Sequence, residues 1–253
     1  MISDLNGRSV LITGAKRGIG AEIARTLARQ GAAVFVADID LPGAESVAAD
    51  IRASGGWAQA RAVDVADAES VATLFGEIDR TERTLDVVVN NAGILEQQDF
   101  LEIDECTWER TMRVNALGPL LCTQEAARRF IGLGRGKIVN ICSTSSRQPS
   151  ARYATYAASK AFLLAFTQAT ARELAPHGIT VNGIGPGIVA TDLWTSADGT
   201  APARDLSGYV ADIPLGRVSE PADVAGLAVF LAGPGSDYIT GQVIMADGGV
   251  VMT

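Results

Sequence analysis

The stretch RSVLITGAKRGIGAEIARTLARQ, residues 8–30, predicts the fold of this chain. Residues 8–13 form an apolar run typical of a short buried strand, and residues 19–30 follow the pattern of a helix. Three glycines lie in the turn between them: Gly14, Gly18 and Gly20. Glycine permits a tight turn and a close approach of the backbone to a phosphate, and a helix amino terminus offers free N–H groups to a pyrophosphate. This order of strand, turn and helix predicts the first unit of a dinucleotide-binding α/β fold.

An acidic residue, Asp38, follows the next apolar run, residues 33–37, and lies 18 residues beyond Gly20. A carboxylate at this point accepts hydrogen bonds from the adenine ribose and repels a 2′-phosphate, so Asp38 favours NAD as the cofactor. Lys16 and Arg17 in the glycine-rich turn are basic and could bind that phosphate instead. NADP is therefore the alternative cofactor.

The alternation of strand and helix patterns continues to the end of the chain. The later strands are expected at residues 57–63, 85–89, 138–142, 179–184 and 242–245. The later helices are expected at residues 42–54, 67–80 and 104–131, around Tyr156 up to residue 175, and from Glu220 onward. Because no linker or repeat interrupts this order, we expect a single domain over residues 1–253. The long connection at about 188–215 indicates a lid over an active site.

Composition and charge exclude several classes of protein. The net charge is −8 and no basic run occurs, which argues against nucleic acid or an anionic membrane as a partner. The amino terminus does not have the pattern of a signal peptide, and no apolar run reaches the roughly 18 residues of a membrane span, so we expect a cytoplasmic protein.

Cys106, Cys122 and Cys142 lack metal-site spacing and are expected in the core. The single histidine, His177, lies in a turn, which argues against a Ser-His-Asp hydrolase or a His-ligated zinc enzyme.

The stretch KIVNICSTSSRQPSARYATYAASK, residues 137–160, holds the candidate catalytic residues. Tyr156 and Lys160 are four apart on an expected helix and therefore share one face. A nearby ammonium favours phenolate, so the sequence predicts a lowered pKa for Tyr156 and proton exchange near neutral pH. Ser143 ends the preceding strand and faces the same space. The alternative is that Tyr156 and Lys160 lie on an ordinary solvated helix face.

Two further segments lie where a flat cofactor would bind. Asp64-Val65 follows the third strand, where a side chain could contact adenine, and Asn90-Asn91-Ala92-Gly93 follows the fourth. Small residues at the end of a strand let a cofactor lie against the backbone, although the same four residues are also typical of a turn.

Asn115 precedes Pro119 by four residues inside the expected helix 104–131. Because proline has no N–H group, the Asn115 carbonyl loses its helical partner and could hold a water molecule. The alternative is that Gly118-Pro119 only bends the helix for packing.

Together these residues resemble the short-chain dehydrogenase/reductase family, and the resemblance covers essentially the whole chain. The matching elements are Thr13-Gly14-x-x-x-Gly18-Ile19-Gly20, Asp64-Val65, Asn90-Asn91-Ala92-Gly93, Asn115, Ser143, Tyr156-x-x-x-Lys160, and Asn182 through Pro186-Gly187 to Thr191. The resemblance implies a single-domain α/β fold, a Rossmann-like doubly wound parallel sheet of about seven strands flanked by helices. It also implies a homotetramer or homodimer formed through the two longest helices.

The resemblance implies four catalytic residues: Asn115, Ser143, Tyr156 and Lys160. In this scheme Tyr156 is the acid or base, Lys160 holds the nicotinamide ribose, Ser143 orients the substrate oxygen and Asn115 holds a water that relays protons. The implied cofactor contacts are Gly14, Arg17, Gly18, Ile19, Gly20, Asp38, Ile39, Asp64, Val65, Asn91, Ala92, Gly93, Tyr156, Lys160, Pro186, Gly187, Val189 and Thr191. No metal ion is expected.

The reaction that the resemblance implies is hydride transfer between the nicotinamide and a secondary alcohol or ketone. Because Asp38 favours NAD, which suits alcohol oxidation, we expect a small alcohol, polyol or sugar as substrate. An NADPH-dependent 3-oxoacyl-(acyl-carrier-protein) reductase, or another ketone reductase, is the alternative. Residues 148–155, QPSARYAT, do not resemble that group, and an acidic chain is a poor partner for an acidic carrier.

Residues near the expected lid are candidates for the substrate pocket. They are Leu193, Trp194 and Tyr209 for an apolar wall, with Gln148 and Arg152 for polar contacts. A second class of function, a non-catalytic dinucleotide-binding module, would not need Asn115, Ser143, Tyr156 and Lys160 together.

Overall fold

The computed structural model describes residues 4–191 and 206–252 and contains one seven-stranded parallel sheet with the order β3-β2-β1-β4-β5-β6-β7. The strands are β1 Ser9–Thr13, β2 Ala33–Asp38, β3 Trp57–Ala62, β4 Val87–Asn90, β5 Gly136–Ile141, β6 Ile179–Pro186 and β7 Val243–Ala246. The order turns back between β1 and β4, which is where doubly wound sheets bind their ligands. The predicted fold class is confirmed.

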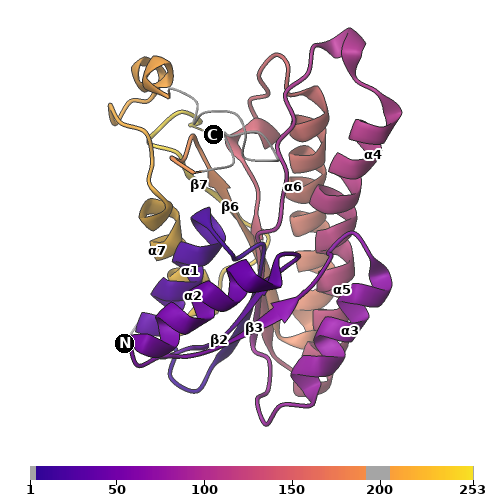
Figure 1. Cartoon of the computed structure of the whole chain (residues 1–253), viewed down its shortest axis with the longest axis vertical. Helices are drawn as coiled ribbons and strands as arrows, with labels where there is room; N and C mark the ends of the chain where they lie inside the picture. The colour runs from indigo at the N-terminus through magenta and orange to yellow at the C-terminus, as the bar shows by residue number, and fades with distance from the viewer. Residues whose placement is uncertain (1–3, 192–205, 253) are drawn as a thin grey trace.

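The helices form two layers, one on each face of the sheet (Figure 1). They are α1 Gly18–Arg29, α2 Leu41–Ala53, α3 Ala68–Asp79, α4 Glu105–Met112, α5 Gly118–Leu133, α6 Ala154–Leu174 and α7 Pro221–Ala232. Short 3-10 turns cover Phe100–Glu102, Thr144–Ser146, Ala175–His177, Ser207–Asp212 and Pro234–Ser236. Helices α1, α2 and α7 share one apolar core with the sheet, while α3, α5 and α6 share the other.

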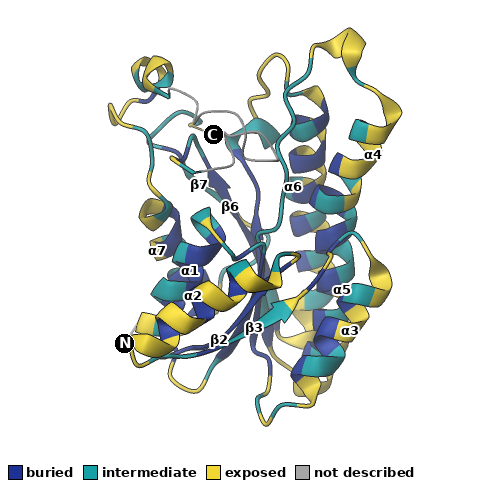
Figure 2. Ribbon diagram, in the orientation of Figure 1, coloured by how far each residue is buried: buried dark blue, intermediate teal, exposed yellow. Residues whose placement is uncertain are grey.

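Alternate residues of each central strand enter these two cores. On β1, Val10 and Ile12 pack with α1 and α7, while Leu11 packs on the opposite face against α3 and α5. Because both faces are covered, the central strands are buried along their whole length, whereas the outward faces of the helices are exposed (Figure 2). This is why these strands read as continuous apolar runs in the sequence.

The expected helix 104–131 is interrupted by a π-helical segment, η2, at Arg113–Leu117. Its predicted cap is correct, since the Asp104 carboxylate accepts the N–H of Thr107 at 2.7 Å. The prediction of one continuous helix is wrong, because near Pro119 the backbone shifts to the wider register, in which the N–H of Gly118 bonds the carbonyl of Arg113. A π-helical turn inside a helix is uncommon and frequently lies at a functional site.

The three cysteines do not all lie in the core. Cys122 and Cys142 are buried as expected, whereas Cys106 is exposed on the outer side of α4, so that part of the prediction is wrong. His177 is exposed in the turn before β6, as predicted. Among residues 4–191 and 206–252, no helix is long and apolar enough to cross a membrane.

Candidate active site

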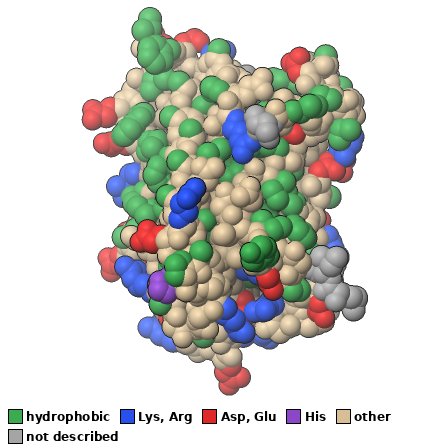
Figure 3. Space-filling view, turned by 180° about the vertical axis from the view of Figure 1, so that it is seen from behind, with side chains coloured by type: hydrophobic (Ala, Val, Ile, Leu, Met, Phe, Trp, Pro, Cys, Tyr) green, Lys and Arg blue, Asp and Glu red, His purple; other side chains and the backbone are tan. Residues whose placement is uncertain are grey.

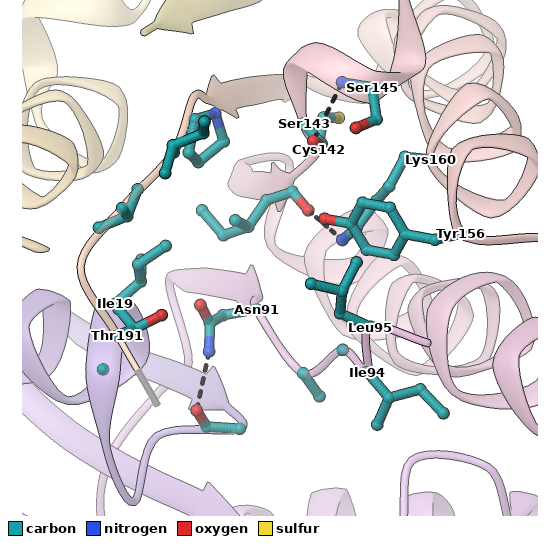
Figure 4. Close-up of a pocket in the computed structure, with 18 of the residues that line it drawn as sticks. Ile19, Asn91, Ile94, Leu95, Cys142, Ser143, Ser145, Tyr156, Lys160 and Thr191 are labelled. Atoms are coloured by element: carbon teal, nitrogen blue, oxygen red, sulfur yellow. Dashed lines mark hydrogen bonds between the residues drawn. The ribbon is translucent and has the colours of Figure 1, made fainter. Parts of the chain in front are cut away.

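A cavity of about 1120 Å³ opens at the carboxyl ends of the strands. Every predicted cofactor contact lines it, from the glycine-rich turn to Thr191, and so do Ser143, Tyr156 and Lys160. Figure 4 shows Ser143, Tyr156 and Lys160 on one side of this space and Ile19 and Thr191 across from them. Of the predicted site residues, Asn115 is the exception, because it lies behind the cavity wall and is completely buried.

The glycine-rich turn packs so tightly that two of its glycines have no room for a side chain. A Cβ atom on Gly14 would lie 2.6 Å from the Ala92 Cα atom, and Gly14 has a φ of 63°. A Cβ atom on Gly20 would lie 2.4 Å from the Asn91 side-chain amide, which donates to the main-chain oxygens of Thr13 and Gly14. The turn after β1 and the segment after β4 therefore form one rigid floor, and this cradle fits a dinucleotide phosphate approaching the start of α1.

Asp38 is held in a fixed orientation at the nucleotide end of the cavity. It is 6% exposed, and its two carboxylate oxygens accept the backbone N–H groups of Lys16 at 3.1 Å and of Asp40 at 3.0 Å. A carboxylate can accept about four hydrogen bonds, so Asp38 keeps capacity for ribose hydroxyls. The Lys16 ammonium lies 3.1 Å from the Asp40 carboxylate and not over Asp38.

At the opposite end, Lys160 and Tyr156 lie on the inner face of α6. The Lys160 ammonium donates to the carbonyl oxygen of Ile141, the last residue of β5, at 2.8 Å, and it lies 5.8 Å from the centre of the Tyr156 ring. Lys160 is 5% exposed and Ser143 is 7% exposed. The alternative of a solvated helix face is therefore wrong.

The predicted lowering of the tyrosine pKa is not what the structure has. Burial raises the pKa of Tyr156 to about 12, and a hydrogen bond with the Ser143 side chain opposes this only in part. Burial also lowers the pKa of Lys160 to about 8, since an ammonium is poorly solvated there. The prediction failed because it counted the charge of Lys160 and not the loss of water around both side chains.

Asn115 joins three separate segments from behind the cavity wall. Its side-chain amide donates to the Ile94 carbonyl at 2.9 Å and to the Ser159 hydroxyl at 3.0 Å, and its side-chain oxygen accepts the Ile94 N–H at 2.9 Å. The Ser159 hydroxyl in turn donates to the carbonyl of Tyr156 at 2.7 Å. Asn115 thus connects the π-helical segment with the residues after β4 and with the first turns of α6.

Several cavity residues carry no recognisable signal in the sequence. They are Ile94, Leu95, Tyr153, Ile213 and Val250. Ile94 and Leu95 follow the Asn-Asn-Ala-Gly segment directly, which could have suggested them, whereas Val250 comes from the far end of the chain.

Gln148 and Tyr209 line the cavity as expected. Arg152 does not line it, because its guanidinium pairs with Asp99 at 2.8 Å. Leu193 and Trp194 lie, with the rest of residues 192–205 of the expected lid, outside the described residues.

Among the parts of the chain that the structure describes, no group of three or more His, Cys, Asp or Glu side chains could hold a metal ion. Cys142, beside Ser143, is buried, which raises the pKa of its thiol to about 11. The Cys142 thiol therefore stays protonated near neutral pH, and Tyr156 and Lys160 are the candidates for proton exchange with a substrate.

Comparison with known proteins gives full-length matches. Residues 14–251 match the family described as enoyl-(acyl carrier protein) reductase. The chain is 38% identical to galactitol 2-dehydrogenase of Agrobacterium fabrum and 37% identical to sorbitol dehydrogenase of Cereibacter sphaeroides, in both cases over 97% of this chain and 98% of the relative. It is also similar to the crystal structure of a gluconate 5-dehydrogenase from Burkholderia cenocepacia in complex with NADP and tartrate, with a TM-score of 0.91, 34% identity and 98% of each chain covered.

Proposed function

Because the chain belongs to the short-chain dehydrogenase/reductase family, we propose that it oxidises a secondary hydroxyl of a sugar alcohol or similar polyol with NAD, and reduces the corresponding ketone in the reverse direction. The chain is an oxidoreductase that acts on CH–OH groups with a nicotinamide nucleotide. The observation that carries the proposal is the single cavity that has Asp38 and the glycine-rich turn at one end and Tyr156, Ser143 and Lys160 at the other.

The nucleotide would be held by the residues of that cavity. The turn Gly14–Gly20 and the start of α1 suit the pyrophosphate, and Asp38 suits the adenine ribose. Pro186, Gly187, Val189 and Thr191 suit the nicotinamide end. When bound, the nicotinamide accepts or gives up a hydride, which no protein side chain can do. Asp38 supports NAD over NADP because its fixed carboxylate would face a 2′-phosphate.

The remaining chemistry belongs to side chains of this chain. The Tyr156 hydroxyl is the proton carrier, and the Ser143 side chain that lowers its pKa lines the same cavity, so both groups face one substrate oxygen. Lys160 is held in place by the Ile141 carbonyl, so its ammonium stays beside the tyrosine. Asn115 fixes the segments on which these groups lie. We assign to it the further role of holding a water that passes protons to Lys160.

The lining of the cavity near Tyr156 supports a hydroxyl-rich substrate. Polar side chains there are Ser145, Gln148, Ser150, Tyr153, Tyr209 and Asp212. Hydroxyl, amide and carboxylate groups can donate to or accept from several hydroxyls of one substrate. The names of two relatives, galactitol 2-dehydrogenase and sorbitol dehydrogenase, point to the same class of substrate.

We also propose that the protein is a single domain working in the cytoplasm as a homotetramer or homodimer, with the segment 188–215 as its lid. Exposed apolar side chains on the two longest helices support the assembly: Ile131 and Leu133 on α5, and Phe162 on α6.

Acidic and basic side chains are interspersed on the face seen in Figure 3, so this face offers nucleic acid no basic surface.

The test is a panel of substrates offered to the purified protein with NAD and with NADP in parallel, followed by the absorbance of the reduced nicotinamide. The panel contains sorbitol, galactitol, gluconate, butane-2,3-diol and, in the reductive direction, an acetoacetyl thioester. The proposal predicts the highest kcat/KM for a neutral polyol with NAD. A preference for the thioester with NADPH would contradict it.

A further inference from the structure

The proposed function assigns NAD selectivity to Asp38, and the present inference rests on that assignment but concerns a different pair of residues. We propose that Asp40 is a second determinant of nucleotide selectivity, which acts by holding the Lys16 ammonium away from the place where the 2′-phosphate of NADP would lie.

Both residues of this pair are anchored on Asp38. The backbone N–H of Lys16 donates to one carboxylate oxygen of Asp38 at 3.1 Å, and the backbone N–H of Asp40 donates to the other at 3.0 Å. Lys16 also lines the cavity beside Asp38. A lysine anchored next to the carboxylate that would bind the ribose is therefore within one side-chain length of a 2′-phosphate.

The Lys16 side chain instead extends over the first turn of α2. A Cβ atom built on Gly43 would lie 3.0 Å from the Lys16 Cβ atom and 3.2 Å from its Cδ atom, so the stem of Lys16 passes over this glycine. The ammonium ends 3.1 Å from Asp40 Oδ2. Since Gly43 has no side chain, the lysine has room to lie there.

Asp40 is needed to keep the ammonium at this position. Its other oxygen, Oδ1, caps α2 by accepting the Gly43 N–H at 3.1 Å, and this bond, followed by the one from Lys16, lowers the pKa of Asp40. The amino terminus of a helix carries a partial positive charge, which repels an ammonium. Without the negative charge of Asp40, Lys16 has no electrostatic reason to stay at α2 and can turn toward a phosphate in the cavity.

The charges at this end of the cavity predict how Asp40 affects the binding of NADPH and of NADH. Asp38, Asp40 and Lys16 together carry a net charge of −1, and Arg17, which also lines the cavity, adds a positive charge that all the variants keep. The Lys16 ammonium is paired with Asp40, whose carboxylate does not line the cavity. Neutralising Asp40 frees a cation for the 2′-phosphate while leaving Asp38 in place for the ribose. The predicted result is tighter NADPH binding with little change in NADH binding.

The experiment is a double-mutant cycle in which the dissociation constants of NADPH and NADH are measured by nucleotide fluorescence on wild type, Asp40→Asn, Lys16→Met and the double variant. Asparagine keeps an oxygen for the α2 cap, and methionine keeps most of the lysine stem, so both variants preserve the fold. Asp104→Asn, which makes the same charge change at the cap of α4 outside the cavity, is the matched control.

Asp40→Asn should bind NADPH about 5-fold more tightly, the factor expected for one pair of unit charges about 4 Å apart in watery surroundings. NADH binding should stay within about two-fold of wild type. Lys16→Met should remove the gain, so that the double variant binds NADPH like Lys16→Met alone. An equal gain with and without Lys16, no gain at all, or the same gain in Asp104→Asn would overturn the proposal. Because no substrate is needed, failure to oxidise sugar alcohols would count against the proposed function alone.

Discussion

The ammonium of Lys160 donates to the carbonyl oxygen of Ile141 across 2.8 Å, which joins helix α6 to the last residue of strand β5. Ser143 follows two residues after Ile141, so this one bond sets the position of the lysine, the tyrosine one turn before it and the serine at the strand end. The bond also explains why Lys160 is buried although it carries an ionisable group. A buried lysine needs a polar partner, and here the partner is a main-chain carbonyl.

The burial of Lys160 predicts a pH dependence of stability. In the folded protein its pKa is lowered to about 8 from an ordinary 10.5, so between these values the unfolded chain binds more protons than the folded one. The free energy of unfolding therefore rises with pH across this window, by on the order of 2 kcal/mol between pH 8 and 10. Urea unfolding of wild type and Lys160→Met at both pH values measures it, because the rise should be missing in the variant.

Lys137→Met is the control for this comparison, since Lys137 is paired with Asp237 at 2.7 Å near the amino-terminal end of β5, away from the cavity. If Lys137→Met abolished the rise as completely as Lys160→Met, the buried lysine would not be its cause. The comparison stops at pH 10 because Tyr156 titrates above that pH. Its pKa is raised from 10 to about 12 in the folded protein, so above pH 10 Tyr156 makes the free energy of unfolding fall as the pH rises.

The floor of the nucleotide site predicts a severe effect of Gly14→Ala. The added Cβ would lie 2.6 Å from the Ala92 Cα atom, and the φ of 63° strains any side chain. We expect a loss of about 2 kcal/mol or more of stability and at least about 10-fold weaker NADH binding, because the turn and the Asn91 segment must separate.

Gly76→Ala is the matched substitution on helix α3, where a Cβ would meet nothing within 4 Å. It should stabilise the protein by about 0.5–1 kcal/mol and leave NADH binding unchanged. Thermal unfolding and fluorescence titration of both variants compare the two glycines. If the two variants had the same stability and the same NADH affinity, the close contact between Gly14 and Ala92 would have no effect on either.

The hydrogen bonds of Asn115 predict that this residue stabilises the cavity wall, behind which it lies. Asn115→Ala leaves the Ile94 N–H and carbonyl without their partner and removes a donor from Ser159, which should cost about 3 kcal/mol of the free energy of unfolding. Ser159→Ala removes only one of these bonds and should cost about 1 kcal/mol. Denaturant unfolding distinguishes them, and a cost for Asn115→Ala no larger than for Ser159→Ala would contradict this role.

Much of the fold could be predicted from the sequence because the central strands are buried on both faces and several helices, among them α2, α3 and α4, begin with an aspartate cap. The strand around Val10–Ile12 and the cap at Asp104 are examples. The interruption of helix 104–131 could not be predicted, although Pro119 marked its place. Local sequence shows that a hydrogen bond is lost there, but the register that replaces it depends on packing against the sheet and α6.

The motifs indicated the cofactor contacts, Ser143, Tyr156 and Lys160, which line one cavity, but neither the cavity residues without a motif nor the electrostatics could be predicted. Spacing puts Tyr156 and Lys160 on one face of a helix, but it does not reveal that the ammonium donates to Ile141 or that both side chains lose their water. The pairing of Lys16 with Asp40 is likewise a tertiary contact between residues 24 apart. Such partners belong to the folded chain and leave no local pattern.

The most direct test of the central claim is the turnover number of Tyr156→Phe with the best polyol substrate, measured beside its NADH dissociation constant. The phenyl ring keeps the packing on α6 but has no proton to give or take. We expect NADH binding within about two-fold of wild type and a kcat lower by at least about 10²–10⁴-fold. A variant that binds NADH and turns over at nearly the wild-type rate would contradict the assignment of Tyr156 and, with it, the account of this site.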